Sequence, residues 1–347
     1  MKKLRFGVIG AGGIADRRTI PGMMQSELCE LTAVMEIHAE QAEKLRVKYG
    51  AKRAYTNEED LLKDPGVDAV YIASPVVMHT RQVKMAADYG KHVLVEKPIG
   101  MTSAEGQAAV DYCAEKGIKL AAGLMMRYGS HVQSMKRAIA EGKLGQVVSG
   151  YSQFTLWLPE SSGNWRLEKA KAGGGCMMDM AVHVIDLMEF ITGMRVTRVA
   201  SMNETITFSY DVEDTSTVLM RMENGAQFVV QTNFNIPDEA SKWRLEVFGT
   251  KGRLLGDTMI GQVDGGTLSL LAMGENKAYD AAQDHADVRG EEIAGVFGNM
   301  YTRELDSFAD SVLNGKALVA PASDAVHVQR IMEAAYKSGE TRTQIEL

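Results

Sequence analysis

The sequence predicts an α/β domain built on a parallel sheet, followed by an α+β domain with a large, mostly antiparallel open sheet. Up to residue 123, short apolar runs alternate with segments of helical periodicity, which is typical of parallel strands joined by crossover helices. After residue 123, strand-like runs are separated by turn residues such as Glu223-Asn224-Gly225, which is typical of antiparallel pairing. At about 150 residues per domain, the length of 347 residues favours two domains. We therefore expect one domain over 1–123 and a second over 124–347.

The composition excludes several classes of protein. Hydrophobic residues make up 45% and charged residues 24%, an ordinary globular mixture that excludes a disordered or fibrous chain. The formal net charge of −7 opposes binding to nucleic acid, and no apolar stretch is long enough to cross a membrane. The three cysteines form no CxxC pair, which argues against a disulfide scaffold and a structural zinc site. We expect a cytoplasmic protein with no nucleic-acid partner, no membrane partner and no metal.

The apolar runs of the first domain are expected to form buried parallel strands, because they are apolar throughout, as in Val93-Leu94-Val95. The expected strands are 4–9, 31–34, 69–73, 93–95 and 119–122. One helix is expected to begin at Gly13, and three further helices are expected over 39–49, 78–89 and 103–116. This order predicts an open, doubly wound sheet, which binds ligands at the carboxyl ends of its strands.

A glycine motif lies between the first expected strand and its helix. Gly10-Ala11-Gly12-Gly13-Ile14-Ala15 fits the G-x-G-x-x-G/A pattern of dinucleotide-binding proteins. In that pattern Gly10 allows the tight turn, Gly12 lets the backbone approach a pyrophosphate, and the helix N-terminus faces the phosphate charge. Glu36 follows the second strand, where an acidic side chain binds ribose hydroxyls and repels a 2′-phosphate. Because Ile37 offers no guanidinium, the sequence predicts NAD rather than NADP; the alternative is a plain turn with Glu36 in solvent.

Glu96-Lys97-Pro98 directly follows the strand 93–95. A lysine at the carboxyl end of a parallel strand faces the ligand crevice, where it can donate to a substrate hydroxyl or carry a proton. The proline fixes the turn that aims this lysine. The alternative is a surface lysine after a strand.

The second domain is expected to begin with a helix over 131–141 and to continue mainly as strands. The expected strands are 147–158, 196–208, 215–222, 226–234 and 242–248. Helices must cover one face of such a sheet, and the other face is left for solvent or association. We therefore expect a homo-oligomer, a dimer or a tetramer, formed through this sheet.

Gly173-Gly174-Gly175-Cys176 opens a predicted helix over 177–192. Asp179 and His183 are four residues apart and share one helical face, which Asp186 continues. An aspartate one turn before a histidine can orient the imidazole and stabilise its protonated form, so that the histidine accepts a proton from a hydroxyl. The alternative is a helix-start carboxylate and a buried structural histidine. A metal site using Asp179, His183 and His79 is disfavoured, because the spacing matches no known ligand pattern.

The ordered set of these motifs resembles the Gfo/Idh/MocA oxidoreductase family, named for glucose-fructose oxidoreductase and inositol dehydrogenase. The resemblance rests on the glycine motif with Glu36, Ser74-Pro75 with His79, Glu96-Lys97-Pro98, Trp165-Arg166, and the triple glycine leading to Asp179 and His183. It implies a Rossmann domain, a C-terminal domain with a large open sheet, a nicotinamide cofactor between them, and carbohydrate-like substrates. It also implies that the last helices, beginning near Tyr301 and Glu304 and ending with 324–337, pack back on the first domain.

The resemblance assigns roles to individual residues. Lys97 binds and polarises the reacting hydroxyl, and Asp179 with His183 supplies the acid and base. The implied cofactor-binding residues are Gly10, Gly12, Gly13, Ile14, Glu36, Ile37, Ser74, Pro75, His79, Glu96, Lys97 and Arg166. The implied substrate-binding residues are Lys97, Arg127, Tyr128, Trp157, Trp165, Asp179 and His183.

The function predicted first is the NAD-dependent oxidation of a secondary hydroxyl of a sugar, cyclitol or glycoside to a ketone, by hydride transfer. A related alternative keeps NAD bound and oxidises a sugar only transiently, so that a glycosidic bond is cleaved or a centre epimerised without net redox change. A non-catalytic sensor of NAD or sugar is a third reading, which the presence of Lys97, Asp179 and His183 together disfavours. The breadth of the family also allows reduction of an imine or a linear tetrapyrrole.

Overall fold

The computed structural model describes residues 2–273 and 290–347, which form two compact units. The first unit comprises Met1–Tyr128 and Asn299–Arg330, and the second comprises Gly129–Gly298 and Ile331–Leu347. The first segment of this unit ends at Tyr128, slightly later than the predicted division at 123/124, and the chain returns to the first unit over Asn299–Arg330, in the region where the last helices were expected to pack back on the first domain.

The first unit is built on a six-stranded parallel sheet with the order β3-β2-β1-β4-β5-β6. Its strands are β1 (Leu4–Ile9), β2 (Cys29–Met35), β3 (Arg53–Tyr55), β4 (Ala69–Ile72), β5 (His92–Val95) and β6 (Leu120–Ala122). The order reverses between β1 and β4, and ligands bind at such a point in open α/β sheets. The predicted doubly wound α/β fold is therefore confirmed, with β3 as an additional short strand.

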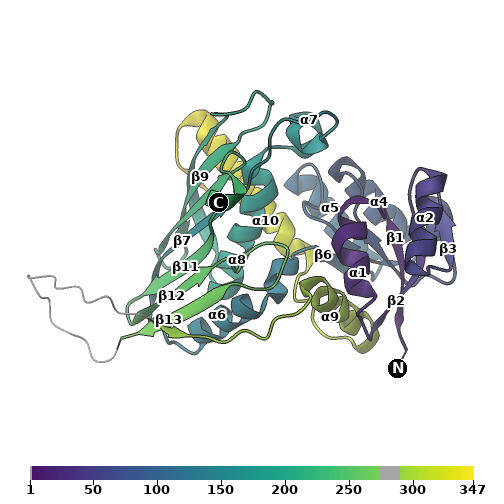
Figure 1. Cartoon of the computed structure of the whole chain (residues 1–347), viewed down its shortest axis with the longest axis horizontal. Coiled ribbons are helices and arrows are strands. Elements are labelled where there is room, and N and C mark those ends of the chain that lie inside the picture. The colour runs from purple at the N-terminus through teal and green to yellow at the C-terminus, as the bar shows by residue number, and fades with distance from the viewer. Residues whose placement is uncertain (1, 274–289) are drawn as a thin grey trace, which may run out of the picture. The chain divides into compact units, whose positions relative to one another are not determined.

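Helices cover both faces of this sheet (Figure 1). The helices are α1 (Ile20–Met23), α2 (Ala39–Tyr49), α3 (Glu58–Leu62), α4 (Val76–Asp88), α5 (Ser103–Glu115), α9 (Met300–Asn314) and the first part of α10 (Ala322–Thr341). One apolar core joins the sheet to α1, α2 and α9, where the rings of Phe6 and Phe308 lie 5.9 Å apart. The other core joins it to α3, α4, α5 and the start of α10, and it includes Leu61, Val83, Ala109 and Val326.

The second unit contains a sheet of nine strands among the described residues, with the order β14-β13-β12-β11-β7-β10-β9-β8-β15. The strands are β7 (Val147–Thr155), β8 (Val196–Glu204), β9 (Thr215–Met222), β10 (Gln227–Asn233), β11 (Trp243–Gly249), β12 (Gly252–Asp257), β13 (Thr267–Ala272), β14 (Glu291–Glu292) and β15 (Ile345–Glu346). The sheet is mostly antiparallel, as predicted. The expected pairing of consecutive strands is wrong for β7 with β8 and for β10 with β11, because β7 lies between β10, its parallel neighbour, and β11.

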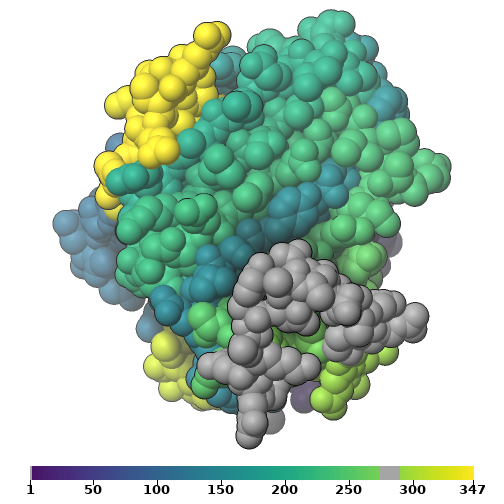
Figure 2. Space-filling view, turned by 90° about the vertical axis from the view of Figure 1, so that its left-hand side faces the viewer, coloured from purple at the N-terminus to yellow at the C-terminus, as the bar shows by residue number. Residues whose placement is uncertain are grey.

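The two faces of this sheet have different surroundings. The second unit's helices are α6 (Ser130–Ala140), the short α7 (Lys169–Ala172), α8 (Val182–Thr192) and the end of α10, and α6 and α8 lie on one face (Figure 1). Along β9, Val218 and Met220 point to that face and are buried, whereas Leu219 and Arg221 point the other way and are exposed. Strands form the visible surface on the exposed side (Figure 2). Within the described residues, no helix combines the length and apolarity that a membrane span requires.

Candidate cofactor and acid–base sites

The glycine motif and Glu36 meet at the carboxyl ends of β1 and β2. Gly10 has a positive φ of 73°, and a Cβ there would lie only 2.8 Å from the backbone nitrogen of Ser74. The amide of Gly12 donates to Glu36 Oε2 at 3.1 Å, and the amide of Ile37 donates to Glu36 Oε1 at 3.1 Å. These contacts hold the Glu36 carboxylate beside the glycine loop, where sequence reasoning places a ribose-binding acid.

The loop fits the phosphates of a dinucleotide. A Cβ at Gly13 would meet nothing within 4 Å, so the backbone beyond Gly12 is open to a ligand. A helix follows at once and includes the π-helical turn Ala15–Thr19, a feature that is frequent at functional sites. Its first amides would hold the pyrophosphate of NAD, and the Glu36 carboxylate would hold a ribose hydroxyl. The residues present therefore fit the predicted cofactor.

The segment after β4 contains Ser74, Pro75 and His79. His79 is 1% exposed, with Nδ1 2.8 Å from the carbonyl oxygen of Pro98 and Nε2 2.8 Å from the carbonyl oxygen of Ser74. Burial lowers the pKa of His79, although both contacts favour its protonated form. Ser74 donates through Oγ to Gln82 at 2.5 Å. The His79 ring thus links the turn after β4 to the turn after β5. It is buried beneath these turns rather than exposed on their surface.

The turn after β5 is anchored through Glu96. The Tyr71 hydroxyl, in the middle of the sheet, donates to Glu96 Oε1 and accepts from the Thr19 hydroxyl at 2.9 Å. A Cβ at Gly123 would stand 3.0 Å from Glu96 Oε2, so this glycine makes room for the carboxylate. Burial, and then the charge of Glu96, raises the pKa of Tyr71 well above its usual value. Glu96 is therefore fixed from inside the unit, and the half-buried Lys97 follows it directly.

Sequence reasoning missed the acidic character of this buried region. Glu304 of α9 is 1% exposed, and burial, followed by the charge of Glu96, raises its pKa well above the usual range. The same two causes raise the pKa of Tyr301. A tyrosine within the otherwise aliphatic strand Ala69–Ile72 was the available signal, because a buried phenol needs a hydrogen-bond partner.

In the second unit, one continuous helical segment contains Asp179 and His183. It begins with the π-helical turn Met177–Ala181 and continues as α8. His183 is 7% exposed, Asp186 is 2% exposed, and Asp179 is half-buried. Asp179 and His183 thus lie on consecutive turns of one helix that packs on the sheet, as the spacing predicts.

Two of the remaining predicted residues, Arg127 and Tyr128, belong to the first unit. Arg127 is buried in the first unit, where its Nη1 donates to Asp324 at 2.8 Å and to the Val319 carbonyl at 2.7 Å. These contacts hold the Arg127 guanidinium within that unit, and its contact with substrate stays a prediction. Tyr128 lies in the same turn, and its carbonyl accepts from Arg303 at 2.9 Å.

Aromatic side chains gather in the second unit. Trp157 is 40% exposed, and its ring lies 5.1 Å from that of Phe208, which stacks on Tyr210 at 5.2 Å. The Arg166 guanidinium lies 4.6 Å from the ring centre of Trp165. Exposed aromatic faces and guanidinium donors suit the apolar faces and hydroxyls of a sugar ring. Among residues 2–273 and 290–347, no three His, Cys, Asp or Glu side chains come together as a metal site requires.

Comparison with known proteins agrees with this architecture. Residues 4–124 match the family described as oxidoreductases with an NAD-binding Rossmann fold, and residues 132–255 match the GFO/IDH/MocA C-terminal domain. The first match covers the glycine motif, Glu36 and Lys97, and the second covers Asp179 and His183. The predicted NAD-binding domain is therefore confirmed.

Individual relatives extend the match. The chain is 30% identical over 267 residues to 1,5-anhydro-D-fructose reductase of Ensifer adhaerens, covering 77% of this chain and 79% of that protein. It is 28% identical over 344 residues to D-xylose 1-dehydrogenase (NADP(+)) 2 of Haloferax volcanii, covering 99% and 100%. The crystal structure of aldose-aldose oxidoreductase from Caulobacter crescentus, complexed with glycerol, shares the fold over 100% of both chains, with a TM-score of 0.89 at 24% identity. The chain belongs to the Gfo/Idh/MocA family and is an NAD-binding oxidoreductase.

Proposed function

We propose that this oxidoreductase oxidises a secondary hydroxyl of a sugar, cyclitol or glycoside to a ketone. The observation that carries the proposal is that one chain combines a cofactor loop, with Glu36 held by the Gly12 amide, and a proton-transfer set of Lys97, Asp179 and His183. A protein that only binds a cofactor or sugar needs no such set. The names of the relatives, a reductase of an anhydro sugar and a dehydrogenase of xylose, support a carbohydrate substrate.

Each residue of the set has a proposed task. NAD, when bound, supplies the carbon that accepts the hydride. Lys97 donates a hydrogen bond to the reacting hydroxyl and stabilises the negative charge that develops on its oxygen. His183 accepts the hydroxyl proton, and Asp179 orients the imidazole and stabilises its protonated form.

NAD is proposed as the preferred cofactor. Both oxygens of the Glu36 carboxylate accept backbone amides, so this negative charge is fixed where a 2′-phosphate of NADP would approach. The two hydrogen bonds also fix the orientation in which the carboxylate meets a ribose hydroxyl. One relative is named for NADP, which makes this residue the place to test the preference.

Nicotinamide absorbance tests the proposal. The chain is incubated with NAD or NADP and a panel of sugars, inositols and glycosides, products are identified by mass spectrometry, and Lys97→Ala is run in parallel. Reduction of NAD with a ketone product that Lys97→Ala fails to form supports the proposal. Product without net reduction would instead establish the redox-neutral reaction, and reduction of NADP alone would overturn the role of Glu36. Cofactor binding without turnover of any substrate would favour the sensor.

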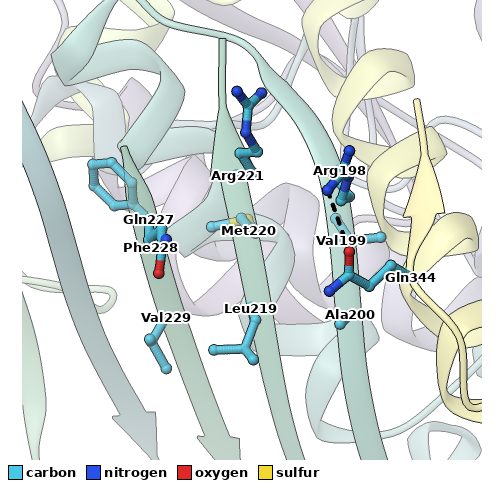
Figure 3. Close-up of a pocket in the computed structure, with 10 residues that line it drawn as sticks. All are labelled: Arg198, Val199, Ala200, Leu219, Met220, Arg221, Gln227, Phe228, Val229 and Gln344. Carbon is cyan, nitrogen blue, oxygen red and sulfur yellow. Dashed lines mark hydrogen bonds between the residues drawn. The ribbon is translucent and has the colours of Figure 1, made fainter. Parts of the chain in front are cut away.

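A homo-oligomer, a dimer or a tetramer, is proposed to form through the open face of the second unit's sheet. Figure 3 shows a shallow pocket on this face, with Leu219 between Ala200 and Val229 and two arginines at one end. Leu219 is 53% exposed there, and Met202 of the neighbouring strand is 78% exposed. Light scattering of Leu219→Glu, with exposed Val47→Glu of the first unit as control, tests this. Dissociation of Leu219→Glu alone supports the proposal, and a wild-type monomer contradicts it.

A reducing compartment such as the cytoplasm is proposed for the protein. Cys29, Cys113 and Cys176 are all buried free thiols. Burial raises the pKa of the Cys113 thiol to about 11, which keeps it unreactive.

A further inference from the structure

One carboxylate binds the start of the helix that contains Asp179 and His183. Glu213 lies just before β9, and its Oε1 accepts from the amide of Gly175 at 2.9 Å and from the amide of Met177 at 3.0 Å. Its backbone carbonyl accepts from the intervening amide of Cys176 at 3.0 Å. Three successive amides at the start of the helix are therefore bound by a single residue. The first amides of a helix have no partner within it, and an acceptor there fixes where the helix begins.

A second side chain joins the hydrogen bonds by which Glu213 holds the helix start, a group of contacts called here the Glu213 anchor. The hydroxyl of Tyr336, in the part of α10 that belongs to the second unit, donates to the same Glu213 Oε1 at 2.8 Å. Glu213 is 9% exposed, so these hydrogen bonds do not compete with bulk water. The sheet also holds the helix start, because Cys176 Sγ donates to the carbonyl of Thr232 at 3.3 Å.

The triple glycine makes these contacts sterically possible. A Cβ at Gly175 would stand 1.9 Å from the Glu213 carbonyl oxygen, and a Cβ at Gly174 would stand 1.8 Å from the Tyr336 hydroxyl oxygen. Any other residue at these two positions would push the anchor away from the helix start. Gly173, by contrast, has a φ of 80° and is needed for its backbone conformation.

We infer that Glu213 is a positioning residue for the acid–base pair Asp179 and His183. The inference rests on the proposed function. Asp179 lies only two residues beyond the last amide that Glu213 binds, so a shift or rotation of the helix start moves the carboxylate that orients His183. A displacement on the order of 1 Å at a reacting group can lower a rate about a hundredfold.

Kinetics of three Glu213 anchor variants test the inference. Glu213→Ala is expected to lower kcat about tenfold to a hundredfold with little change in KM and in NADH affinity. Glu213→Gln keeps an oxygen that can accept all three side-chain hydrogen bonds, so most of the activity should return. Tyr336→Phe, which removes one donor, should have an intermediate effect. With a substrate deuterated at the reacting carbon, the kinetic isotope effect should rise in Glu213→Ala, because hydride transfer becomes slower relative to binding and release.

Glu189→Ala is the matched control. Glu189 is 5% exposed and lies near the other end of α8, where it accepts from the amide of Val196 and from Arg195, both at 2.8 Å. Its loss should lower the thermal midpoint about as much as the loss of Glu213, yet leave kcat and the isotope effect unchanged. Equal kinetic losses in the two variants would reduce Glu213 to a residue that only supports the fold, and would overturn the inference.

Hydrogen exchange separates failure of this inference from failure of the proposed function. In Glu213→Ala, amides in a peptide spanning 173–181 should lose protection, whereas Glu189→Ala should leave this peptide unchanged. Unaltered exchange in Glu213→Ala contradicts the anchor, whatever the enzyme turns over. A wild-type chain that oxidises no member of the substrate panel contradicts the proposed function, while exchange still decides whether Glu213 fixes the helix start.

Discussion

The cofactor loop of the first unit and the acid–base helix of the second differ in where their supports come from. Glu36 reaches the Gly12 amide across 24 residues, from the neighbouring parallel strand, so both partners belong to one compact motif. The helix with Asp179 is held by Glu213, 36 residues beyond Met177, and by Tyr336, 123 residues beyond Glu213. A site built from adjacent loops is visible as a motif, whereas a site built on one helix depends on distant residues that no motif contains.

The largest expected effect concerns Lys97. Lys97→Ala should lower turnover by about 10²- to 10⁴-fold, the usual contribution of a positioned proton donor, and leave NADH binding little changed. Steady-state rates and NADH fluorescence titration measure the two quantities. Lys91→Ala is the control, because Lys91 precedes β5 and its Nζ donates to the backbone carbonyls of Asp64 and Val67, at the opposite end of the strand from Lys97. Equal losses in both variants would remove Lys97 from the mechanism.

Asp179→Asn should have the next largest effect. The amide keeps the size of the side chain but removes the charge that stabilises a protonated His183, so turnover should fall about a hundredfold, the low end of the contribution of an acid–base group. NADH binds the first unit and should be unaffected. Full turnover by Asp179→Asn in the pH range 6 to 9 would show that His183 needs no carboxylate partner.

These predictions depend on a fold that the sequence describes unevenly. The buried parallel strands were predictable because each is a local apolar run, and the helix Ala39–Tyr49 was predicted residue for residue. Arg53–Tyr55 and Glu58–Leu62 are too short to show a period, and they were missed. The parallel pair of β7 and β10 joins strands that are far apart in the chain, so turn residues gave no sign of it.

Local sequence patterns likewise predict some residues of the site and not others. The positions of Gly12, Glu36 and Lys97 at strand ends follow from local pattern. The burial of Arg127 against Asp324 does not, because it depends on the return of the chain to the first unit after residue 298. The two glycines that admit the Glu213 anchor were recognisable as a motif, but their steric reason required the structure.

Glu36→Ser tests the role of this carboxylate in cofactor binding and selection. Loss of the carboxylate removes a charged hydrogen-bond partner of the ribose, which is worth about 1.5–3 kcal/mol, or roughly tenfold to a hundredfold in NAD affinity. It also removes the repulsion of a 2′-phosphate, so the ratio of kcat/KM for NADP over NAD should rise. Glu30→Gln, at the other end of β2, is the control. An unchanged ratio in Glu36→Ser would show that Glu36 does not select the cofactor.

The smallest expected effect is on stability against pH. Burial and the charge of Glu96 raise the pKa of Glu304 in the folded state, so the folded chain binds this proton more tightly than the unfolded chain. The contribution of Glu304 to the free energy of unfolding is therefore full below about pH 4.3 and is lost as the pH rises towards its folded pKa. Glu304→Gln cannot titrate, so its free energy of unfolding relative to wild type should be greater at pH 8 than at pH 5, with a limiting slope of about 1.4 kcal/mol per pH unit. Urea unfolding of both chains measures these free energies. A difference in the free energy of unfolding between the two chains that is the same at both pH values would contradict this prediction.

The most direct test of the division between a cofactor-binding unit and an acid–base unit is to measure NADH binding and turnover together in His183→Asn. The asparagine removes the proposed base from the second unit and leaves every residue of the glycine loop in place. We predict that the dissociation constant for NADH stays at the wild-type value while turnover falls by about 10²- to 10⁴-fold. Near-normal turnover accompanied by weakened NADH binding would contradict the account, because His183 would then belong to the cofactor site rather than to proton transfer.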